Sequence, residues 1–126
     1  MVQQSSCFVC LLTPPSRSAI ATLLVDGAGA TEQVARLLRP NSGKRLDDIP
    51  LAQIVVGRLL TEDGSLGEEV VVCRRGPQRV EVHCHGGRTA AAAITRSLVL
   101  AGCREARWQD REVDLERGQI AAEART

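Results

Sequence analysis

The chain has 126 residues, a length that suits one domain with a single modest hydrophobic core. Its 16 Lys and Arg residues nearly balance 15 Asp and Glu residues, and the net charge of +1 excludes a large non-specific surface for nucleic acid or anionic membrane. Phe8 and Trp108 are the two aromatic residues, which excludes a row of stacking side chains for single-stranded nucleic acid.

The N-terminal part of the chain predicts two strands followed by a helix. Strands are expected over 7–12 and 20–25, where apolar and β-branched residues predominate. A helix is expected over 31–38, with Thr31 as its N-cap and Pro40 as its end, because proline cannot continue a helix. The polar residues that follow predict a loop.

The rest of the chain alternates predicted strands with helices. Asp63-Gly64 is a hairpin signal, and Gly102 is an expected helix end. Further strands are expected over 51–61, 69–74, 79–85 and 103–108, and further helices over 88–101 and 114–124. Hairpins mixed with helical crossovers predict an α+β (mixed α/β) fold, with a mixed sheet of about five to six strands and two to three helices.

Location and cysteine chemistry follow from the same sequence. No apolar run approaches the length that crosses a bilayer, and residues 1–12 lack the pattern of a secretory signal. We therefore expect a cytoplasmic protein with no membrane partner. In that reducing compartment, free and mostly buried thiols are expected at Cys7, Cys10, Cys73, Cys84 and Cys103.

One predicted strand, 79–85, alternates ionisable with apolar residues. Successive side chains of a strand point to opposite faces, so Val80, Val82 and Cys84 are expected to face the core and Arg79, Glu81, His83 and His85 the other side. Gly86 and Gly87 follow, where backbone can approach a ligand and the next helix offers free N–H groups. This arrangement predicts a small pocket for a polar or anionic ligand.

Two other interpretations of these residues stay open, and so does the role of Arg17. The ionisable face can simply be the solvated side of an antiparallel sheet. His83 and His85 can ligate a metal from one strand face, with Glu81 nearby. Arg17, in the loop after the first strand, can bind an anion or a partner chain, or be solvated.

The motifs of the chain resemble the N-terminal domain of the tRNA-modification GTPase family TrmE. Residues 80–87, V-E-V-H-C-H-G-G, are similar to that family's E-[IV]-H-C-H-G-G segment. Residues 12–21, L-T-P-P-S-R-S-A-I-A, look like its opening A-T-P-P-G-R-G-G-I-A. Residues 57–64 resemble its G-x-[IL] strand and turn, and 113–123 resemble the [LV]-D-L-x-Q-A-E-A stretch that begins its helical domain.

The resemblance implies a dimeric domain that binds a tetrahydrofolate derivative of the 5-formyl-tetrahydrofolate type. In the family, the whole enzyme works with a flavoprotein to modify the wobble uridine of certain tRNAs, and it hydrolyses GTP. We therefore expect a homodimer, with a TrmE-like GTPase or its flavoprotein as further partners and no direct contact with nucleic acid. The expected cofactor-binding residues are Glu81, His83, His85, Gly86, Gly87 and Arg17.

The folate contacts of the family transfer unevenly to this sequence. The glutamate that contacts folate in the family corresponds to Glu81 in this sequence. The family's arginine in the second strand corresponds to Leu24. Its lysine falls on Glu112, or on Arg111 with a one-residue slip. Each lost charge-assisted contact is typically worth about 1.5–3 kcal/mol, so two losses weaken the expected binding by roughly two to four orders of magnitude.

Other departures concern the catalytic parts of the family. Residues 42–45, Ser-Gly-Lys-Arg, lack the upstream glycine and the final hydroxyl of a phosphate loop, and the C-terminal C-[IV]-G-K motif is absent. We therefore expect no GTP binding and no catalysis by this chain alone. Residues 1–126 are expected to form a single TrmE N-terminal-like domain, with about 112–126 as the start of a truncated helical domain. The alternative is a degenerate protein–protein interaction module without a ligand.

Overall fold

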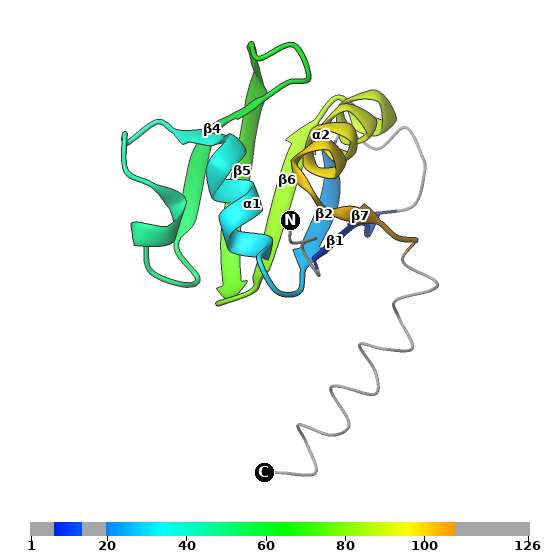
Figure 1. The fold of residues 1–126 in the computed structure, drawn as a ribbon. Coiled ribbons are helices and arrows are strands. Elements are labelled where there is room, and N and C mark those ends of the chain that lie inside the picture. The colour runs from blue at the N-terminus through cyan, green and yellow to red at the C-terminus, as the bar shows by residue number, and fades with distance from the viewer. Residues whose placement is uncertain (1–6, 14–19, 108–126) are drawn as a thin grey trace, which may run out of the picture.

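The computed structural model describes residues 7–13 and 20–107, which form one mixed sheet with two helices (Figure 1). The strands are β1 (Phe8–Leu11), β2 (Ile20–Asp26), β3 (Leu38–Pro40), β4 (Ile54–Leu60), β5 (Leu66–Gly76), β6 (Arg79–His85) and β7 (Arg104–Glu105). The helices are α1 (Ala30–Leu37) and α2 (Gly87–Ala101), with a 3₁₀ turn, η1 (Leu46–Asp48). The strand order is β3-β4-β5-β6-β2-β1-β7, and β7 pairs parallel with β1 while the other neighbours are antiparallel.

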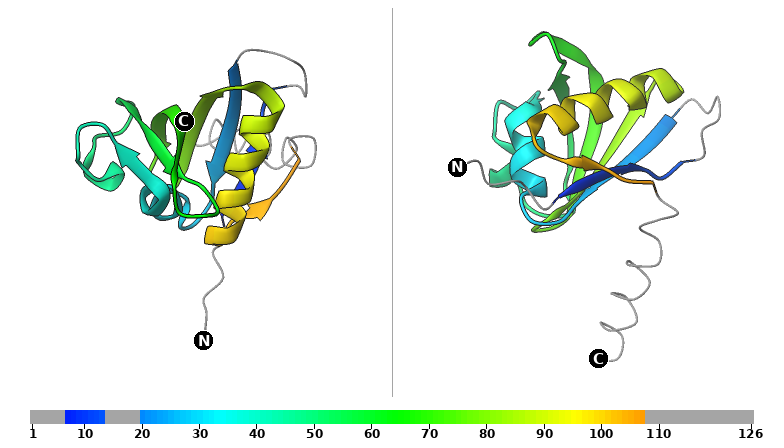
Figure 2. Two further views of the ribbon diagram at one scale, coloured as in Figure 1. Left: turned by 90° about the horizontal axis from the view of Figure 1, so that it is seen from above. Right: turned by 45° about the vertical axis from the view of Figure 1, so that its right-hand side comes forward.

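Both helices pack on the same face of the sheet, so the domain has two layers (Figures 1 and 2). Each helix contacts the central strands β2 and β6, and the two helices contact one another. The main core lies between the layers, where the largest fully buried side chains include Leu23, Val25, Val80, Val82 and Leu98. We call the opposite side of the sheet the helix-free face. No helix among the described residues is long and apolar enough to cross a membrane.

The α+β fold class with a mixed sheet is confirmed, although seven strands exceed the expected five to six. The extra strand is β3, which forms at the end of the predicted helix and before the predicted loop. α1 ends at Leu37, one residue before the expected end, and Leu38, Arg39 and Pro40 then pair with β4 as a strand. The expected terminal helix over 114–124 lies outside the described residues.

The predicted N-cap of the first helix was wrong. Gly29, not Thr31, is the N-cap residue, with a left-handed backbone (φ 88°) that favours glycine. Thr31 lies inside the first turn, where its hydroxyl donates a hydrogen bond of 2.8 Å to the carbonyl of Pro77 in the β5–β6 turn. The Thr31 hydroxyl therefore ties the helix to the sheet rather than capping α1.

Gly57 makes the β3–β4 pairing possible, which leads to a stability prediction. A Cβ atom at Gly57 would lie 2.6 Å from the carbonyl oxygen of Arg39 and 2.8 Å from Cα of Pro40, both backbone atoms that cannot swing aside. We expect Gly57→Ala to lower the free energy of unfolding by about 1–3 kcal/mol, as overpacking does elsewhere. Urea unfolding followed by circular dichroism measures this loss.

Gly76→Ala is the matched control for that substitution. A Cβ at Gly76 meets its nearest atom, Cβ of Arg79, at an ordinary 3.9 Å. The control is therefore expected to change the free energy of unfolding by less than about 0.5 kcal/mol. Equal losses in the two variants would mean that the close approach of β3 to β4 is not what constrains position 57.

The β4–β5 hairpin contains an acid-sensitive turn. The Asp63 carboxylate accepts hydrogen bonds from the hydroxyls of Ser65 and Thr61 and from the Ser65 backbone N–H, and these bonds lower the pKa of Asp63 from 3.8 to about 2. Because the folded pKa is depressed, the contribution of this turn is complete above pH 3.8 and is lost as the pH falls through about 2. Carboxyl NMR titration is expected to give a midpoint near 2 for Asp63. Ser65→Ala should move it toward 3.8, and an ordinary midpoint in the unmodified chain would contradict the prediction.

Candidate functional site

The side chains of β6 alternate between the two faces of the sheet as predicted. Val80, Val82 and Cys84 are buried in the main core under the helices. Glu81 and His83 lie on the helix-free face, where their side chains are 25% and 33% exposed. These intermediate exposures leave both groups accessible to a ligand while their positions are fixed by neighbouring strands.

A continuous polar network on the helix-free face joins three strands. Its members, which we call the Glu81 network, are Thr22 on β2, Arg75 on β5, and Glu81 and His83 on β6. The Thr22 hydroxyl lies 2.9 Å from Nδ1 of His83, and Nε2 of His83 lies 3.5 Å from Oε2 of Glu81. The same Oε2 lies 3.3 Å from Nε of Arg75. The arrangement presents a carboxylate between an imidazole and a guanidinium.

Sequence reasoning did not identify Thr22 and Arg75 as members of this site. Their placement follows from strand register, since Thr22 is paired with His83 across β2 and β6. Arg75 lies beside an irregularity in the β5–β6 pairing, between Arg74 and Gly76. The short connection between β5 and β6 makes them pair as a hairpin, but the sequence does not predict the irregularity in this pairing that brings Arg75 beside Glu81.

A buried apolar cluster borders the Glu81 network. Leu24 is the register partner of Glu81 on β2, and it is buried in a small cluster with Phe8 and Cys10 on the helix-free face. Beyond it, Arg79 and Asp26 form an ion pair of 3.0 Å across the same two strands. The accessible groups of this face are therefore the Glu81 carboxylate, the His83 imidazole and the guanidinium groups of Arg75 and Arg79, a set that suits a polar ligand carrying both hydrogen-bond donors and anionic groups.

Two of the remaining candidate residues line a separate groove. His85 and Gly86 line a groove of about 340 Å³ between α2 and the β4–β5 hairpin, on the helix side of the sheet. Glu81 and His83 do not line this groove. Gly86 is the N-cap of α2 with φ 92°, and a Cβ there would lie 3.1 Å from Cβ of Ala90, so both conformation and space favour glycine. Arg17 lies outside the described residues.

The groove on the helix side is mainly apolar. Its lining includes Leu59, Val70, Cys84 and Ile94, with Glu68 among the polar side chains. Burial, together with the Glu68 carboxylate, raises the pKa of the Cys84 thiol. The protonated Cys84 thiol therefore acts as an apolar packing group in the floor of the groove and not as a nucleophile.

The part of the chain that the structure describes contains no cluster of side chains that could hold a metal ion. Within 7–13 and 20–107, no three His, Cys, Asp or Glu side chains are placed to hold an ion. Both ring nitrogens of His83 already have protein partners, Thr22 and Glu81. His85 lies at the exposed end of β6.

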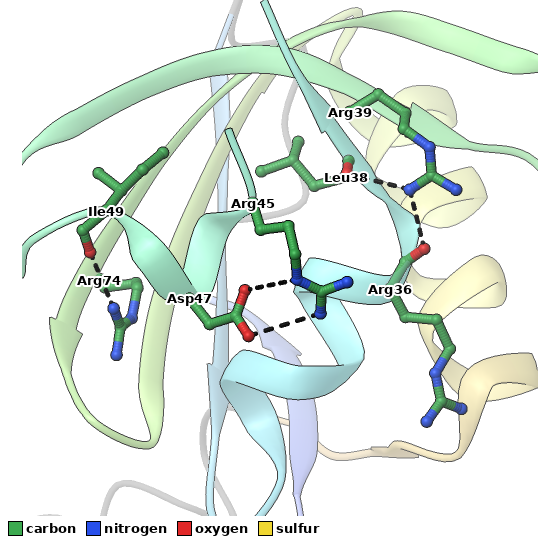
Figure 3. Close-up of polar contacts among 7 residues, drawn as sticks. All are labelled: Arg36, Leu38, Arg39, Arg45, Asp47, Ile49 and Arg74. Carbon is green, nitrogen blue, oxygen red and sulfur yellow. Dashed lines mark hydrogen bonds and ion pairs between the residues drawn. The ribbon is translucent and has the colours of Figure 1, made fainter. Parts of the chain in front are cut away.

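A group of basic residues surrounds the loop after β3 (Figure 3). Arg39 Nη1 donates hydrogen bonds to the carbonyls of Arg36 and Leu38, at 3.0 and 3.1 Å. These bonds satisfy two backbone oxygens near the C-terminal end of α1. Arg45 faces Asp47, with Nε 3.1 Å from Oδ1, and this pairing lowers the pKa of Asp47. Residues 42–45 lie between a short strand and a 3₁₀ turn, so they lack the strand–loop–α-helix geometry of a phosphate loop.

Known proteins match this chain over the region that contains the strands of the site. Residues 7–108 match the family model described as GTP-binding protein TrmE N-terminus. The tRNA modification GTPase MnmE of Geobacillus kaustophilus is 35% identical over 100 residues, which cover 73% of this chain and 22% of that protein. MnmE of Christiangramia forsetii is 31% identical over 104 residues, covering 78% of the chain and 22% of the relative. MnmE of Erythrobacter litoralis is 36% identical over 92 residues, covering 72% of the chain and 18% of the relative.

The extent of these matches establishes the family. The chain spans about a fifth of the length of these relatives. The family match includes β1 to β7 and therefore the whole described sheet. The chain belongs to the TrmE N-terminal family.

Proposed function

We propose that this chain is a self-associating module of tRNA modification that binds a tetrahydrofolate derivative on its helix-free face. Membership of the TrmE N-terminal family supports the connection with tRNA modification, because the relatives are named tRNA modification GTPases. The chain itself supplies no phosphate loop in its sequence, so GTP hydrolysis is assigned to a different polypeptide or segment.

The Glu81 network is the observation that carries the folate proposal. A pterin ring presents neighbouring N–H donors, and the Glu81 carboxylate can accept them as charge-assisted hydrogen bonds. Arg75 and Arg79 place guanidinium groups on the same side of the sheet, where they can attract the carboxylates of a folate tail. Leu24 and the adjacent cluster are buried beside Glu81 and form the packed apolar support of this part of the face. The donor and acceptor set therefore fits this cofactor class.

Calorimetry with 5-formyl-tetrahydrofolate tests the proposal. We expect measurable heat of binding, and we expect Glu81→Gln to weaken the affinity about 10-fold or more, since a charge-assisted hydrogen bond is lost. Glu32→Gln, the same change at an exposed position on α1, is the matched control and should bind like the unmodified chain. Absence of heat from the unmodified chain at millimolar ligand would remove the folate part of the proposal.

A second candidate is an interaction module that has lost its ligand. The observation in its favour is Leu24, an apolar residue beside Glu81 at the position to which the family resemblance assigns an arginine. Sedimentation separates the candidates when it is combined with calorimetry. A dimer that gives no heat with folate supports the interaction module, whereas a monomer that binds folate supports the ligand-binding module without self-association.

A further inference from the structure

Two buried cysteines lie in contact at the edge of the main core. Sγ of Cys7 and Sγ of Cys103 are 3.0 Å apart, although 96 positions separate them in the sequence. Both side chains belong to the main core cluster, and neither is in a disulfide. A bond length of about 2.05 Å therefore requires the sulfurs to approach by only about 1 Å.

Strand register explains why the two thiols meet. β1 and β7 pair in parallel, with Phe8 opposite Arg104 and Val9 opposite Glu105. Continuing that register by one residue places Cys7 opposite Cys103, and the Arg104 N–H donates to the Cys7 carbonyl at 3.1 Å. Neighbouring strands lie about 4.8 Å apart, which falls within the Cα separation of about 4.4–6.8 Å that disulfides use. The backbone is thus already arranged for a bond.

We propose that Cys7 and Cys103 form an oxidisable pair that hydroperoxides convert to an intramolecular disulfide. The thiolate of one cysteine attacks an oxygen of hydrogen peroxide, which gives a sulfenic acid and hydroxide. The second thiolate then attacks the sulfenic sulfur and displaces hydroxide, forming the S–S bond. The two thiols lose two protons and two electrons, and the peroxide is reduced to two waters.

Access for the oxidant depends on the position of the pair at the edge of the sheet. Burial and the neighbouring Cys7 raise the pKa of the Cys103 thiol, so this thiol stays protonated and slow to react while β7 is paired with β1. β7 has two residues, both exposed, and it ends the strand order beside β1. A short edge strand opens at low cost, which admits a small oxidant and permits deprotonation. Reaction is therefore expected to be slow in the closed state and limited by opening of β7.

The consequence of oxidation is a covalent link between β1 and the segment that follows α2. In the reduced chain, β7 is held to β1 by backbone hydrogen bonds such as the one from the Ala106 N–H to the Val9 carbonyl, at 2.9 Å. A disulfide beside these bonds prevents β7 from separating. Oxidation thus fixes the edge of the sheet at which the described chain ends.

The folded chain treated with hydrogen peroxide provides the test. After quenching and denaturation, we expect the titratable thiols to fall from five to three. Peptide mapping should show one crosslink, between Cys7 and Cys103, which a dithiol reductant reverses. Hydrogen exchange at the Arg104 and Ala106 amides should slow at least 10-fold in the oxidised chain.

Cysteine variants test whether the loss of two thiols comes from Cys7 and Cys103. Cys10→Ala removes a buried thiol on the helix-free face and should leave the two-thiol loss unchanged. Cys7→Ala and Cys103→Ala should each abolish the intramolecular crosslink. Retention of all five thiols in the unmodified chain, under conditions that oxidise an unfolded sample, would overturn the proposal. A crosslink between other cysteines, or between two chains, would overturn it as well, and neither result depends on a variant folding.

Discussion

Leu98→Ala is expected to lower the free energy of unfolding by about 2–5 kcal/mol, the range for a fully buried leucine. Leu98 is 0% exposed and lies on the face of α2 that packs into the main core. Truncation removes apolar contacts and leaves a cavity that the surrounding strands cannot completely fill. Because small domains have total stabilities of about 5–15 kcal/mol, this loss is a large share of the total. Urea unfolding followed by circular dichroism measures it.

Leu100→Ala is the control in the same helix. Leu100 is 68% exposed, so the same chemical change two residues later removes little buried surface. We expect the free energy of unfolding to change by less than about 0.5 kcal/mol. Similar losses in both variants would show that the C-terminal half of α2 is not oriented as described, because helix propensity alone cannot distinguish the two leucines.

The helices and most strands were predictable because their local patterns agree with their burial. β6 is the clearest case, since the period-two alternation of valine and cysteine with ionisable residues matches its two faces. Leu98 lies in the helix that was expected over 88–101, and it is fully buried. The Asp63-Gly64 turn also forms, with Gly64 at a positive φ of 84° that a tight hairpin turn requires.

Two features of the fold were not predicted correctly because they depend on contacts with residues far away in the sequence. Strand β3 has only three residues, and its extended conformation depends on the close approach of Gly57 on β4. Thr31 has the residue type of an N-cap, but its hydroxyl is used by the carbonyl of Pro77 from a distant turn. Neither partner can be identified from local sequence.

The candidate site shows the same limit. Alternation within β6 places Glu81 and His83 on one face, and this much follows from a single strand. The partners of these residues come from β2 and β5, and they depend on the pairing of Thr22 with His83 and on the irregularity beside Arg75. Sequence reasoning thus identifies the acidic and imidazole groups but not the groups that hold them. His85 and Gly86 line the groove beside α2, which Glu81 and His83 do not line, and this separation depends on the turn into α2.

Leu24→Arg is expected to raise the affinity for 5-formyl-tetrahydrofolate about 10- to 150-fold, which corresponds to one charge-assisted contact of about 1.5–3 kcal/mol. Leu24 is paired with Glu81 across β2 and β6, so an arginine there presents its guanidinium beside the carboxylate. The family resemblance assigns an arginine to this position. Calorimetry with the folate derivative measures the gain.

Two physical effects of Leu24→Arg oppose one another, and the control must separate them. The new side chain forfeits packing with Phe8 and Cys10, which lowers stability, while its charge adds a partner for the ligand. Leu24→Met keeps an apolar side chain of similar volume and supplies no charge, so it should bind like the unmodified chain. If folded Leu24→Arg protein, verified by its thermal transition, binds no more tightly than Leu24→Met, then the guanidinium does not reach the ligand. In that case position 24 serves the packing of β1 on β2, and the helix-free face binds through the Glu81 network alone.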